Sequence, residues 1–271
     1  FHAADIHLGA EPDKGFPWSK ERGQEIWDSF RRLIRQAGEE KAGLFLIAGD
    51  LFHRQPLMKE LKEVNYLFST IPDTKVVLIA GNHDYLKRES YYLRFPWAEN
   101  VFCLWGDQEP CVEFPDLGTA VYGISYDRKE ITDPLYHHIR PQRRQPLEIL
   151  LAHGGDRTHI PFDRSVLEQA GFSYVALGHI HKPEVLIENR MAFSGSPEPL
   201  DKTEAGQHGM FMGEINEVTR MVTSLKFVPL ARIQYISLAV NVTTATTNTE
   251  LAMKITQEIQ NRGPENIFRF R

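Results

Sequence analysis

The stretch at residues 76–84, Val-Val-Leu-Ile-Ala-Gly-Asn-His-Asp, decides how the rest of the chain is interpreted. Its first five residues form an uninterrupted apolar run, which is typical of a strand buried on both faces of a parallel sheet. The run ends in an amide, an imidazole and a carboxylate instead of ordinary turn residues. Ligands bind open α/β sheets outside the carboxyl ends of the strands, so this turn is a candidate functional site. Taken alone, it also fits a simple Gly-Asn turn with a surface histidine.

The same arrangement, a buried strand followed by metal-binding residue types, occurs at four further places in the chain. Apolar runs at 44–48, 147–152 and 174–177 end in such residues, and so does the strand expected at the start of the sequence. The side chains concerned are Asp5, His7, Asp50, Asn82, His153, His179 and His181. Carboxyl ends of parallel strands share one edge, so all seven are expected to converge at one edge of the sheet.

The spacing within two of these segments adds a local expectation. Asp5 and His7 are two residues apart, and so are His179 and His181. Side chains at i and i+2 lie on the same face of an extended segment, which predicts that each pair points the same way.

The seven side chains comprise two carboxylates, one amide and four imidazoles. This mixture suits Mn²⁺, Fe²⁺ or Zn²⁺ and disfavours Ca²⁺, which takes oxygen ligands. Seven ligands are more than one ion accepts while keeping an open position. They predict two ions about 3.5–4 Å apart with one bridging carboxylate, as in two-metal hydrolases. A lone Asp-x-His or His-x-His is a weak signal, but only 11 of 271 residues are histidine, and they recur at these strand ends.

Composition sets limits on the class of protein. The 271 residues are 42% hydrophobic and 25% charged, which is typical of a soluble globular chain with one large domain and an appendage. The net charge of −5 lacks the basic footprint of most nucleic-acid binders. Any such role must rest on a local patch, with metal ions supplying part of the positive charge.

Cysteine usage and hydropathy predict an intracellular location. Cys103 and Cys111 are too few for a disulfide framework, so reduced thiols are expected, with a disulfide across a hairpin as the alternative. No apolar run approaches the ~20 residues that cross a bilayer, and no signal peptide is visible. Phe1 opens inside an apolar strand, so we expect a few leading residues, including the initiator Met, to be missing.

The periodicity of apolar residues predicts several helices. One begins near Ser19, a second is opened by Pro56 at its first turn, and a short one lies near 163–170. Around residue 229 the pattern changes to a strand, a helix introduced by a capping box at 247–250, and a strand beginning at Ile267. This predicts a main domain at 1–228 and the opening of a smaller α+β domain at 229–271.

The motifs together resemble those of calcineurin-like metallophosphoesterases, and within that superfamily the SbcD group. The segments that carry the resemblance are Asp5-Ile6-His7-Leu8-Gly9, Gly49-Asp50-Leu51-Phe52-His53, Gly81-Asn82-His83-Asp84, His153-Gly154, Gly178-His179-Ile180-His181 and the Ser-Pro-Glu-Pro-Leu-Asp run at 196–201. They stand in the family's order and span nearly the whole chain.

The resemblance implies a four-layer αββα sandwich with two Mn²⁺ ions, Fe²⁺ or Zn²⁺ being the alternatives. It assigns one ion to Asp5, His7 and His181, the other to Asn82, His153 and His179, and the bridging position to Asp50. By the family pattern His83 meets the scissile phosphate and assists the leaving oxygen, oriented by Asp84. His53 resembles the family's second phosphate-facing histidine.

The branch resemblance further implies a DNA nuclease of double-strand-break repair, exonucleolytic on ends and endonucleolytic on single strands. Residues 1–228 would be the nuclease domain, and 229–271 the truncated start of a DNA-binding capping domain. The expected DNA contacts are Lys87, Arg88, Tyr91, Tyr92 and Arg94, with Arg140, Arg143 and Arg144 as a second candidate patch. Each patch also reads as an ordinary solvated charged face.

The implied partners are DNA, a second copy in a homodimer, and an SbcC-type ATPase. The ATPase binds the family through a region beyond the cap, so this fragment is not expected to bind it. A cytoplasmic, nucleoid-associated location without membrane contact is expected.

Two alternatives stay open. The first is a same-fold phosphoesterase for nucleotides, phosphoproteins or lipid precursors; Arg54 stands where protein phosphatases carry a phosphate-clamping arginine, although His53 replaces the expected aspartate. The second is a non-catalytic scaffold on a decayed phosphoesterase fold, as in the retromer subunit of that type. Decay removes ligands or the catalytic histidine, and this sequence lacks none of them.

Overall fold

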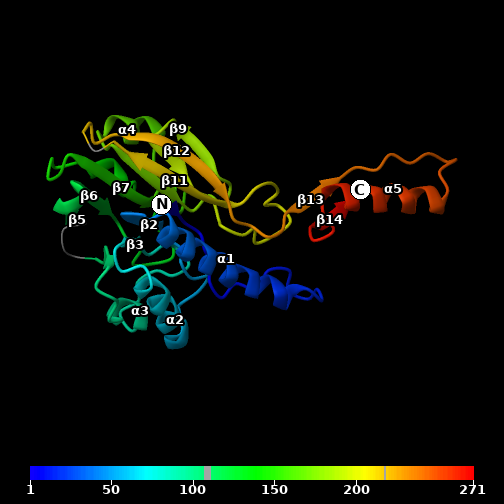
Figure 1. The fold of residues 1–271 in the computed structure, drawn as a ribbon, viewed down its shortest axis with the longest axis horizontal. Coiled ribbons are helices and arrows are strands. Elements are labelled where there is room, and N and C mark those ends of the chain that lie inside the picture. The colour runs from blue at the N-terminus through cyan, green and yellow to red at the C-terminus, as the bar shows by residue number, and fades with distance from the viewer. Residues whose placement is uncertain (107–110, 217) are drawn as a thin grey trace.

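Two six-stranded sheets pack face to face and carry helices on their outer sides (Figure 1). The computed structural model describes residues 1–106, 111–216 and 218–271. The first sheet has the order β12-β11-β1-β2-β3-β4, and the second has the order β5-β6-β7-β8-β10-β9. Helices α1, α2 and α3 lie beside the first sheet, and α4 lies beside the second. The predicted αββα sandwich is therefore confirmed.

The elements have the following bounds. The first sheet comprises β1 (His2–Ala3), β2 (Leu44–Ala48), β3 (Lys75–Ile79), β4 (Val101–Cys103), β11 (Gly209–Ile215) and β12 (Val222–Pro229). The second comprises β5 (Cys111–Phe114), β6 (Thr119–Gly123), β7 (Leu147–His153), β8 (Tyr174–Gly178), β9 (Glu184–Ile187) and β10 (Met191–Phe193). The helices are α1 (Ser19–Glu39), α2 (Met58–Ser69), α3 (Tyr91–Arg94) and α4 (Arg164–Gln169), with 3-10 turns at Pro115–Leu117 and Leu135–His138.

Alternating side chains on the central strands build separate layers of core. In β2, Phe45 and Ile47 pack against the helices, whereas Leu46 and Ala48 pack against the other sheet. Full burial of a large aliphatic or aromatic side chain is worth roughly 1.5–3 kcal/mol. Because both faces of these strands are covered, their sequences read as continuous apolar runs.

The two main helices differ in how well their starts could be predicted. Helix α1 begins at Ser19 as predicted and buries one face, including Ile26, Phe30 and Leu33. Helix α2 begins at Met58, two residues after Pro56, because the Glu60 carboxylate accepts a hydrogen bond from the Leu57 amide at 2.8 Å. The first backbone amides of a helix have no acceptor within the helix, and a carboxylate from the first turn can accept a hydrogen bond from one of them.

Strand direction brings the predicted ligands together. Strands β1, β2 and β3 are mutually parallel, and so are β6, β7 and β8 in the other sheet. Across the interface β2 contacts both β7 and β8. The prediction that all seven ligands lie at one edge of one sheet is corrected here. Asp5, His7, Asp50 and Asn82 follow strands β1, β2 and β3 of the first sheet. The other three ligands, His153, His179 and His181, lie at the ends of β7 and β8 in the second sheet.

The C-terminal segment forms a small βαβ unit that projects from the sandwich (Figure 1). Strands β13 (Tyr235–Leu238) and β14 (Ile267–Phe270) pair in parallel, and α5 (Asn248–Arg262) joins them. The predicted capping box is present, since the Thr247 hydroxyl accepts from the Glu250 amide at 3.2 Å and the Glu250 carboxylate accepts from the Thr247 amide at 2.8 Å. No residue of α5 is buried.

The two cysteines form no disulfide among the described residues. Cys103 ends β4 and Cys111 begins β5, and these strands belong to different sheets. The alternative of a disulfide across one hairpin is therefore wrong. Within the described ranges, no helix is both long enough and apolar enough to cross a membrane.

A buried histidine links the two sheets. The Nδ1 atom of His2 lies 2.9 Å from the Tyr174 hydroxyl, and its Nε2 atom lies 3.2 Å from the carbonyl oxygen of Leu177. Only an Nε2–H can donate to that carbonyl, so the tyrosine hydroxyl donates to Nδ1. Burial lowers the pKa of His2 to about 3.

This histidine predicts a loss of stability in mild acid. The unfolded His2 has a pKa near 6.5, so below that pH only the unfolded state takes up its proton. Its contribution to the free energy of unfolding is complete above pH 6.5 and falls by about 1.4 kcal/mol per pH unit below it. Between pH 7.5 and pH 5.0 in urea unfolding, the wild type should lose about 2 kcal/mol relative to His2→Gln, whose amide offers one acceptor and one donor but does not titrate. An equal loss in both proteins would contradict this.

Candidate metal centre

Glycines at the strand ends leave the space that the predicted ligands occupy. A Cβ atom on Gly81 would lie 2.2 Å from Oδ1 of Asp50, and one on Gly49 would lie 2.4 Å from Nδ1 of His153. A Cβ on Gly178 would lie 2.0 Å from the Ala48 carbonyl oxygen. The turns of both sheets therefore close on one another only because these positions lack side chains.

The backbone at the ligand positions corrects the expectation of extended segments. Asp5, His7 and Asp50 have φ values of +51°, +52° and +50°, and His179 has +93°. These are left-handed conformations, which cost roughly 1–3 kcal/mol at a non-glycine residue. The side chains of Asp5 and His7 converge because the chain curls after β1, and not because they share a face of an extended strand.

The first predicted ligand group comes together around the end of β1. The Nε2 atoms of His7 and His181 lie 3.1 Å apart, and Nε2 of His181 lies 3.9 Å from Oδ1 of Asp5. Asp5 and His7 are fully buried. These are the three side chains that the family pattern assigns to one ion.

The second predicted group lies beside the first. The Asn82 side-chain oxygen is 3.0 Å from Nε2 of His153 and 3.2 Å from Nδ1 of His179. Asp50 stands between the groups, since its Oδ2 atom is 3.5 Å from Nε2 of His153 and 3.7 Å from Nε2 of His7. All seven predicted ligands thus lie in one cluster, with Asp50 in the position of a bridge.

The electrostatics of the cluster fit two divalent cations. Burial raises the pKa of Asp5 to about 6, because a charged carboxylate is costly to bury. Burial has the same tendency at Asp50, but His153 and His7 hold its pKa well below the usual range. Two buried carboxylates beside four imidazoles offer nitrogen and oxygen donors to a common space. This donor set fits borderline divalent ions.

Each of the four histidines in the cluster has a partner for its far ring nitrogen. His153 Nδ1 donates to the carbonyl oxygen of Ala48 at 2.8 Å, and His7 Nδ1 lies 3.2 Å from Nδ1 of His53. The remaining two far nitrogens face carboxylates: His179 faces Asp156 at 2.8 Å and His181 faces Glu204 at 2.7 Å. Sequence reasoning missed both carboxylates. Asp156 stands three residues after the end of β7, as Asn82 does after β3, but it was not recognised as part of a motif, and Glu204 lies in a turn remote from any strand end that carries a ligand.

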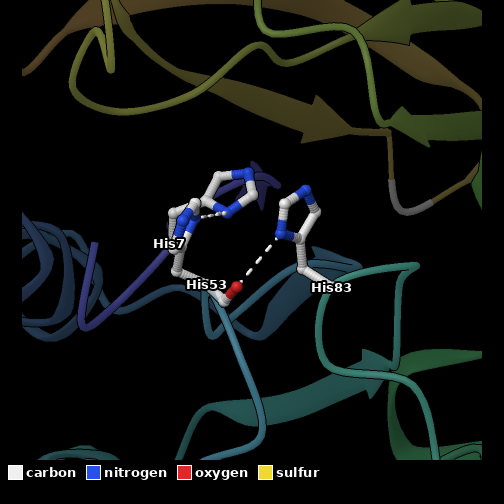
Figure 2. Close-up of side chains that lie close together, drawn as sticks. All are labelled: His7, His53 and His83. Atoms are coloured by element: carbon white, nitrogen blue, oxygen red, sulfur yellow. Dashed lines mark hydrogen bonds between the residues drawn. The ribbon is translucent and has the colours of Figure 1, made fainter. Parts of the chain in front are cut away.

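The two histidines predicted to face the phosphate lie together (Figure 2). The His83 Nδ1 atom is 3.0 Å from the His53 carbonyl oxygen, and the two rings stack with centroids 5.0 Å apart. Figure 2 shows the His7 ring beside both of them, and its centroid is 4.8 Å from that of His83. These contacts connect the turn at Gly81–Asp84, which is called the catalytic turn after the role predicted for His83, to the loops after β1 and β2.

The predicted role of Asp84 in orienting the His83 ring is corrected. The Asp84 carboxylate accepts hydrogen bonds from the backbone amides of Gly81 at 2.8 Å and Phe52 at 3.1 Å. The His83 ring takes its orientation from the His53 carbonyl oxygen instead. Asp84 is therefore a positioning residue that ties the catalytic turn to the loop after β2.

The segment after the catalytic turn divides into exposed and buried residues. The predicted DNA contacts Lys87, Arg88, Tyr91 and Arg94 have exposed side chains. Tyr92 is fully buried and packs edge-on against the rings of Phe52 and Trp105. Its assignment as a DNA contact is wrong, because the first turn of α3 directs alternate tyrosines outward and inward.

Other basic residues of interest are already engaged. The two terminal guanidinium nitrogens of Arg54 donate to the Glu60 carboxylate, at 2.8 and 2.9 Å, so this arginine stabilises the start of α2. In the second predicted patch, Arg144 lies 3.4 Å from a carboxylate oxygen of Glu113, and Arg140 donates to the carbonyl oxygen of His137. These contacts weaken the case for either as a phosphate ligand.

A cleft of about 320 Å³ opens beside the cluster. His7, His53 and His83 form part of its wall, and Glu11 and Asp13 lie on its rim. A larger cavity of about 790 Å³ is lined by residues such as Phe1 and Arg220 and contains no predicted ligand. The chemistry therefore belongs to the smaller cleft.

A two-sheet sandwich with a buried His/Asp/Asn cluster beside a cleft lined by histidines is the arrangement expected of a metal-dependent phosphoesterase. The sequence pattern of the calcineurin-like phosphoesterase family matches residues 1–183. The chain belongs to this family, which confirms the predicted superfamily.

The curated relatives include DNA repair proteins. "DNA double-strand break repair protein Mre11" of Methanocaldococcus jannaschii is 30% identical over 220 residues, covering 75% of this chain and 57% of the relative. The protein of the same name from Saccharolobus solfataricus is 28% identical over 227 residues, covering 75% and 55%. "Uncharacterized metallophosphoesterase YhaO" of Bacillus subtilis is 29% identical over 234 residues, covering 78% and 56%. The chain thus spans a little over half the length of these relatives.

The close approach of Asp50 to Gly81 predicts that adding one methyl group at this position weakens metal binding. In Gly81→Ala the new Cβ would meet Asp50 at 2.2 Å, which must displace the bridging carboxylate or the turn that carries Asn82. We expect Mn²⁺ affinity to fall at least tenfold by isothermal titration calorimetry, the usual loss when a ligand is misplaced. Gly213→Ala is the matched control, since its Cβ has no neighbour closer than 3.6 Å. Unchanged Mn²⁺ binding by Gly81→Ala would rule out the bridging position of Asp50.

Proposed function

We propose that this chain is the nuclease part of an SbcD-type, Mn²⁺-dependent DNA repair enzyme. It would hydrolyse phosphodiesters from DNA ends and in single strands. The observation that carries the proposal is the gathering of seven ligand-type side chains in one cluster, beside a cleft that is lined by two of them, His7 and His181, and by His83. The similarity to relatives named for double-strand-break repair supports DNA as the substrate.

Two divalent ions held by the seven ligands would activate the attacking water and offset the charge that accumulates on the phosphate. The protein contributes His83, whose ring lies beside that of His7 in the wall of the cleft. Its Nδ1–H donates to the His53 carbonyl oxygen, and this bond persists whether or not Nε2 is protonated. The ring is therefore held in one orientation while Nε2–H serves as the acid for the leaving oxygen.

The hydrogen bonds also assign a role to His53. If Nε2 of His7 faces an ion, its Nδ1–H donates to Nδ1 of His53. The neutral His53 ring then carries its proton on Nε2. Burial lowers the pKa of His53, which favours this neutral form. His53 is thus a hydrogen-bond donor for a phosphate oxygen and not the acid.

Lys87, Arg88, Tyr91 and Arg94 are proposed to carry the DNA backbone toward the cleft. They are exposed, and they follow the catalytic turn directly in the sequence. Residues 1–228 are proposed as the nuclease domain and 229–271 as the start of a capping domain, because β12 closes the first sheet and the βαβ unit follows it. Homodimerisation, an SbcC-type ATPase partner and a nucleoid location follow from the same branch assignment.

One observation favours a second candidate function, hydrolysis of a small phosphoester. Glu11, Asp13, Asp201 and Glu204 line the cleft beside the cluster, and such a wall repels a long polyanion more than a single phosphate. A protein phosphatase is disfavoured within this class, since Arg54 is held by Glu60. Turnover of mononucleotide esters in preference to DNA would select this candidate.

His83→Ala tests the assigned acid. We expect it to reduce Mn²⁺-dependent cleavage of labelled single-stranded and duplex DNA by roughly 100- to 10,000-fold, the usual contribution of general acid catalysis. Two ions per chain should still bind, because His83 is not a proposed ligand. His138→Ala removes an exposed histidine from the 3-10 turn at Leu135–His138 and should cleave at the wild-type rate. Wild-type cleavage by His83→Ala would remove its assigned role.

The exposed cations after the turn predict a salt-dependent effect. In the Mn²⁺-loaded His83→Ala background, Lys87→Gln with Arg88→Gln should weaken DNA binding and reduce the slope of log affinity against log salt by about two. Lys59→Gln with Lys62→Gln removes two exposed charges from α2 and is the matched control. The same slope in both double variants would exclude the proposed path of the backbone.

A further inference from the structure

Two of the four histidines in the cluster share one feature. His179 and His181 each present one ring nitrogen to the cluster and the other to a carboxylate on a separate loop. The family pattern assigns these two histidines to different ions. The two carboxylates, Asp156 and Glu204, belong to no motif in the sequence.

The contact of Asp156 fixes the tautomer of His179. A carboxylate only accepts, so His179 must carry its proton on Nε2, 2.8 Å from Oδ2 of Asp156. Its Nδ1 atom, 3.2 Å from the Asn82 oxygen, is then left with a lone pair facing the cluster. The carboxylate itself is held by Oδ1, which accepts from the backbone amides of Thr158 and His159 at 2.7 and 2.9 Å.

Glu204 fixes the opposite tautomer in His181, because it contacts the other ring nitrogen. Its Oε1 atom is 2.7 Å from Nδ1 of His181, so the proton lies on Nδ1 and the lone pair on Nε2. That Nε2 atom faces His7 and Asp5. The other Glu204 oxygen accepts from the Leu200 amide at 2.8 Å, which fixes the carboxylate in the turn.

The loop that carries Glu204 is anchored at a buried polar centre. Glu198 is 2% exposed; it bonds to the Ser29 hydroxyl and accepts from the Arg232 amide at 3.0 Å. Arg22 of α1, also buried, donates to the carbonyl oxygen of Pro199 at 2.6 Å. The Ser-Pro-Glu-Pro run therefore fixes the base of the turn that brings Glu204 to His181.

We propose that Asp156 and Glu204 are positioning residues, each of which presents one histidine to one ion, so that the two ions are controlled separately. This inference rests on the proposed metal centre but not on the identity of the phosphoester. Partners of metal-binding histidines commonly tune affinity, and their loss lowers it roughly 10- to 100-fold. Asp156 would set the affinity of the ion at Asn82, His153 and His179. Glu204 would set that of the ion at Asp5, His7 and His181.

The matched amides test this, because they keep the shape and reverse the hydrogen bonding to the histidine rings. In Asp156→Asn the Oδ1 atom still accepts from the backbone amides of Thr158 and His159. Oδ2 bonds to two rings, Nε2 of His179 and Nδ1 of His159, each at 2.8 Å, so the new NH₂ group donates to both. The proton of His179 is thereby driven onto Nδ1, where a metal ion cannot bind. Glu204→Gln likewise keeps the bond to Leu200 and drives the proton of His181 onto Nε2.

Two measurements are needed. Long-range ¹H–¹⁵N spectra of the metal-free protein, recorded at alkaline pH where the imidazoles are neutral, report the histidine tautomers. We expect Asp156→Asn to switch His179 together with His159, and Glu204→Gln to switch His181 alone. Titration of Mn²⁺ in the calorimeter should show two binding steps in the wild type. Each amide variant should weaken one step by roughly 10- to 100-fold, and the double variant should weaken both.

Two controls separate the hydrogen bond from charge alone. Glu184→Gln removes an exposed charge three residues after His181, at the start of β9, from a side chain that does not line the cleft. Asp163→Asn removes an exposed charge between β7 and α4, where the side chain makes no capping bond. Both controls should bind two Mn²⁺ ions like the wild type.

The possible failures are distinguishable. Unchanged tautomers and wild-type Mn²⁺ binding in both amide variants would overturn the positioning role while leaving the proposed nuclease intact. A double variant no weaker than either single variant would overturn separate control of the two ions. A wild type that binds fewer than two Mn²⁺ ions would overturn the proposed metal centre itself.

Discussion

The face-to-face packing of the two sheets is the constraint on which the centre depends. Leu46 and Ala48 of β2 pack against Ile149 and Ala176 of the opposite sheet. No single sheet holds a complete ligand group, because Asp5, Asp50 and Asn82 come from one sheet and most of the histidines from the other. The apolar interface therefore sets the distances between the ligand atoms of the two sheets, and a change in the thickness of this interface would change those distances. Protein interiors are close-packed, so they transmit such changes to neighbouring residues instead of absorbing them.

Polar contacts hold the strand ends once the sheets have met. Glycines at 49, 81 and 178 let the turns approach, and left-handed residues such as Asp5 and His179 aim their side chains inward. Backbone amides then hold the carboxylates: His83 donates to Asp50 at 2.9 Å, and His179 donates to Asp5 at 2.9 and 3.1 Å. The strained backbone and the buried charges stabilise one another only when assembled, which is typical of a pre-organised functional site.

The inner part of this site could be read from the sequence, and its surroundings could not. Buried strands produce apolar runs and their ends carry the ligands, so Asp50, Asn82 and His153 stood out. The division of the ligands between two sheets was not predicted, since periodicity does not say which strands pair and the family resemblance implied two sheets without assigning the ligands to them. The local geometry at Asp5 was misjudged because spacing alone does not reveal a positive φ. Tyr92 was misjudged because a four-residue helix is too short to show an amphipathic pattern.

The outer carboxylates were invisible for a different reason. Asp156 and Glu204 reach the cluster from loops whose paths depend on tertiary contacts, and neither spacing nor composition encodes such a path. The Ser-Pro-Glu-Pro run was noticed as a motif without a physical account. The structure supplies one, because Glu198 within it anchors the chain to α1. Motifs of this kind mark a fixed path of the backbone as often as they mark chemistry.

One contact of the C-terminal unit reaches the mouth of the cleft. The Tyr235 hydroxyl, at the start of β13, donates to Asp13 at 2.7 Å, and the same carboxylate accepts from the indole of Trp18 at 2.8 Å. Asp13 lies on the rim of the cleft that contains His53 and His83. This hydrogen bond ties the C-terminal unit to a side chain that lines the cleft, so a displacement of the unit must either break the bond or move Asp13.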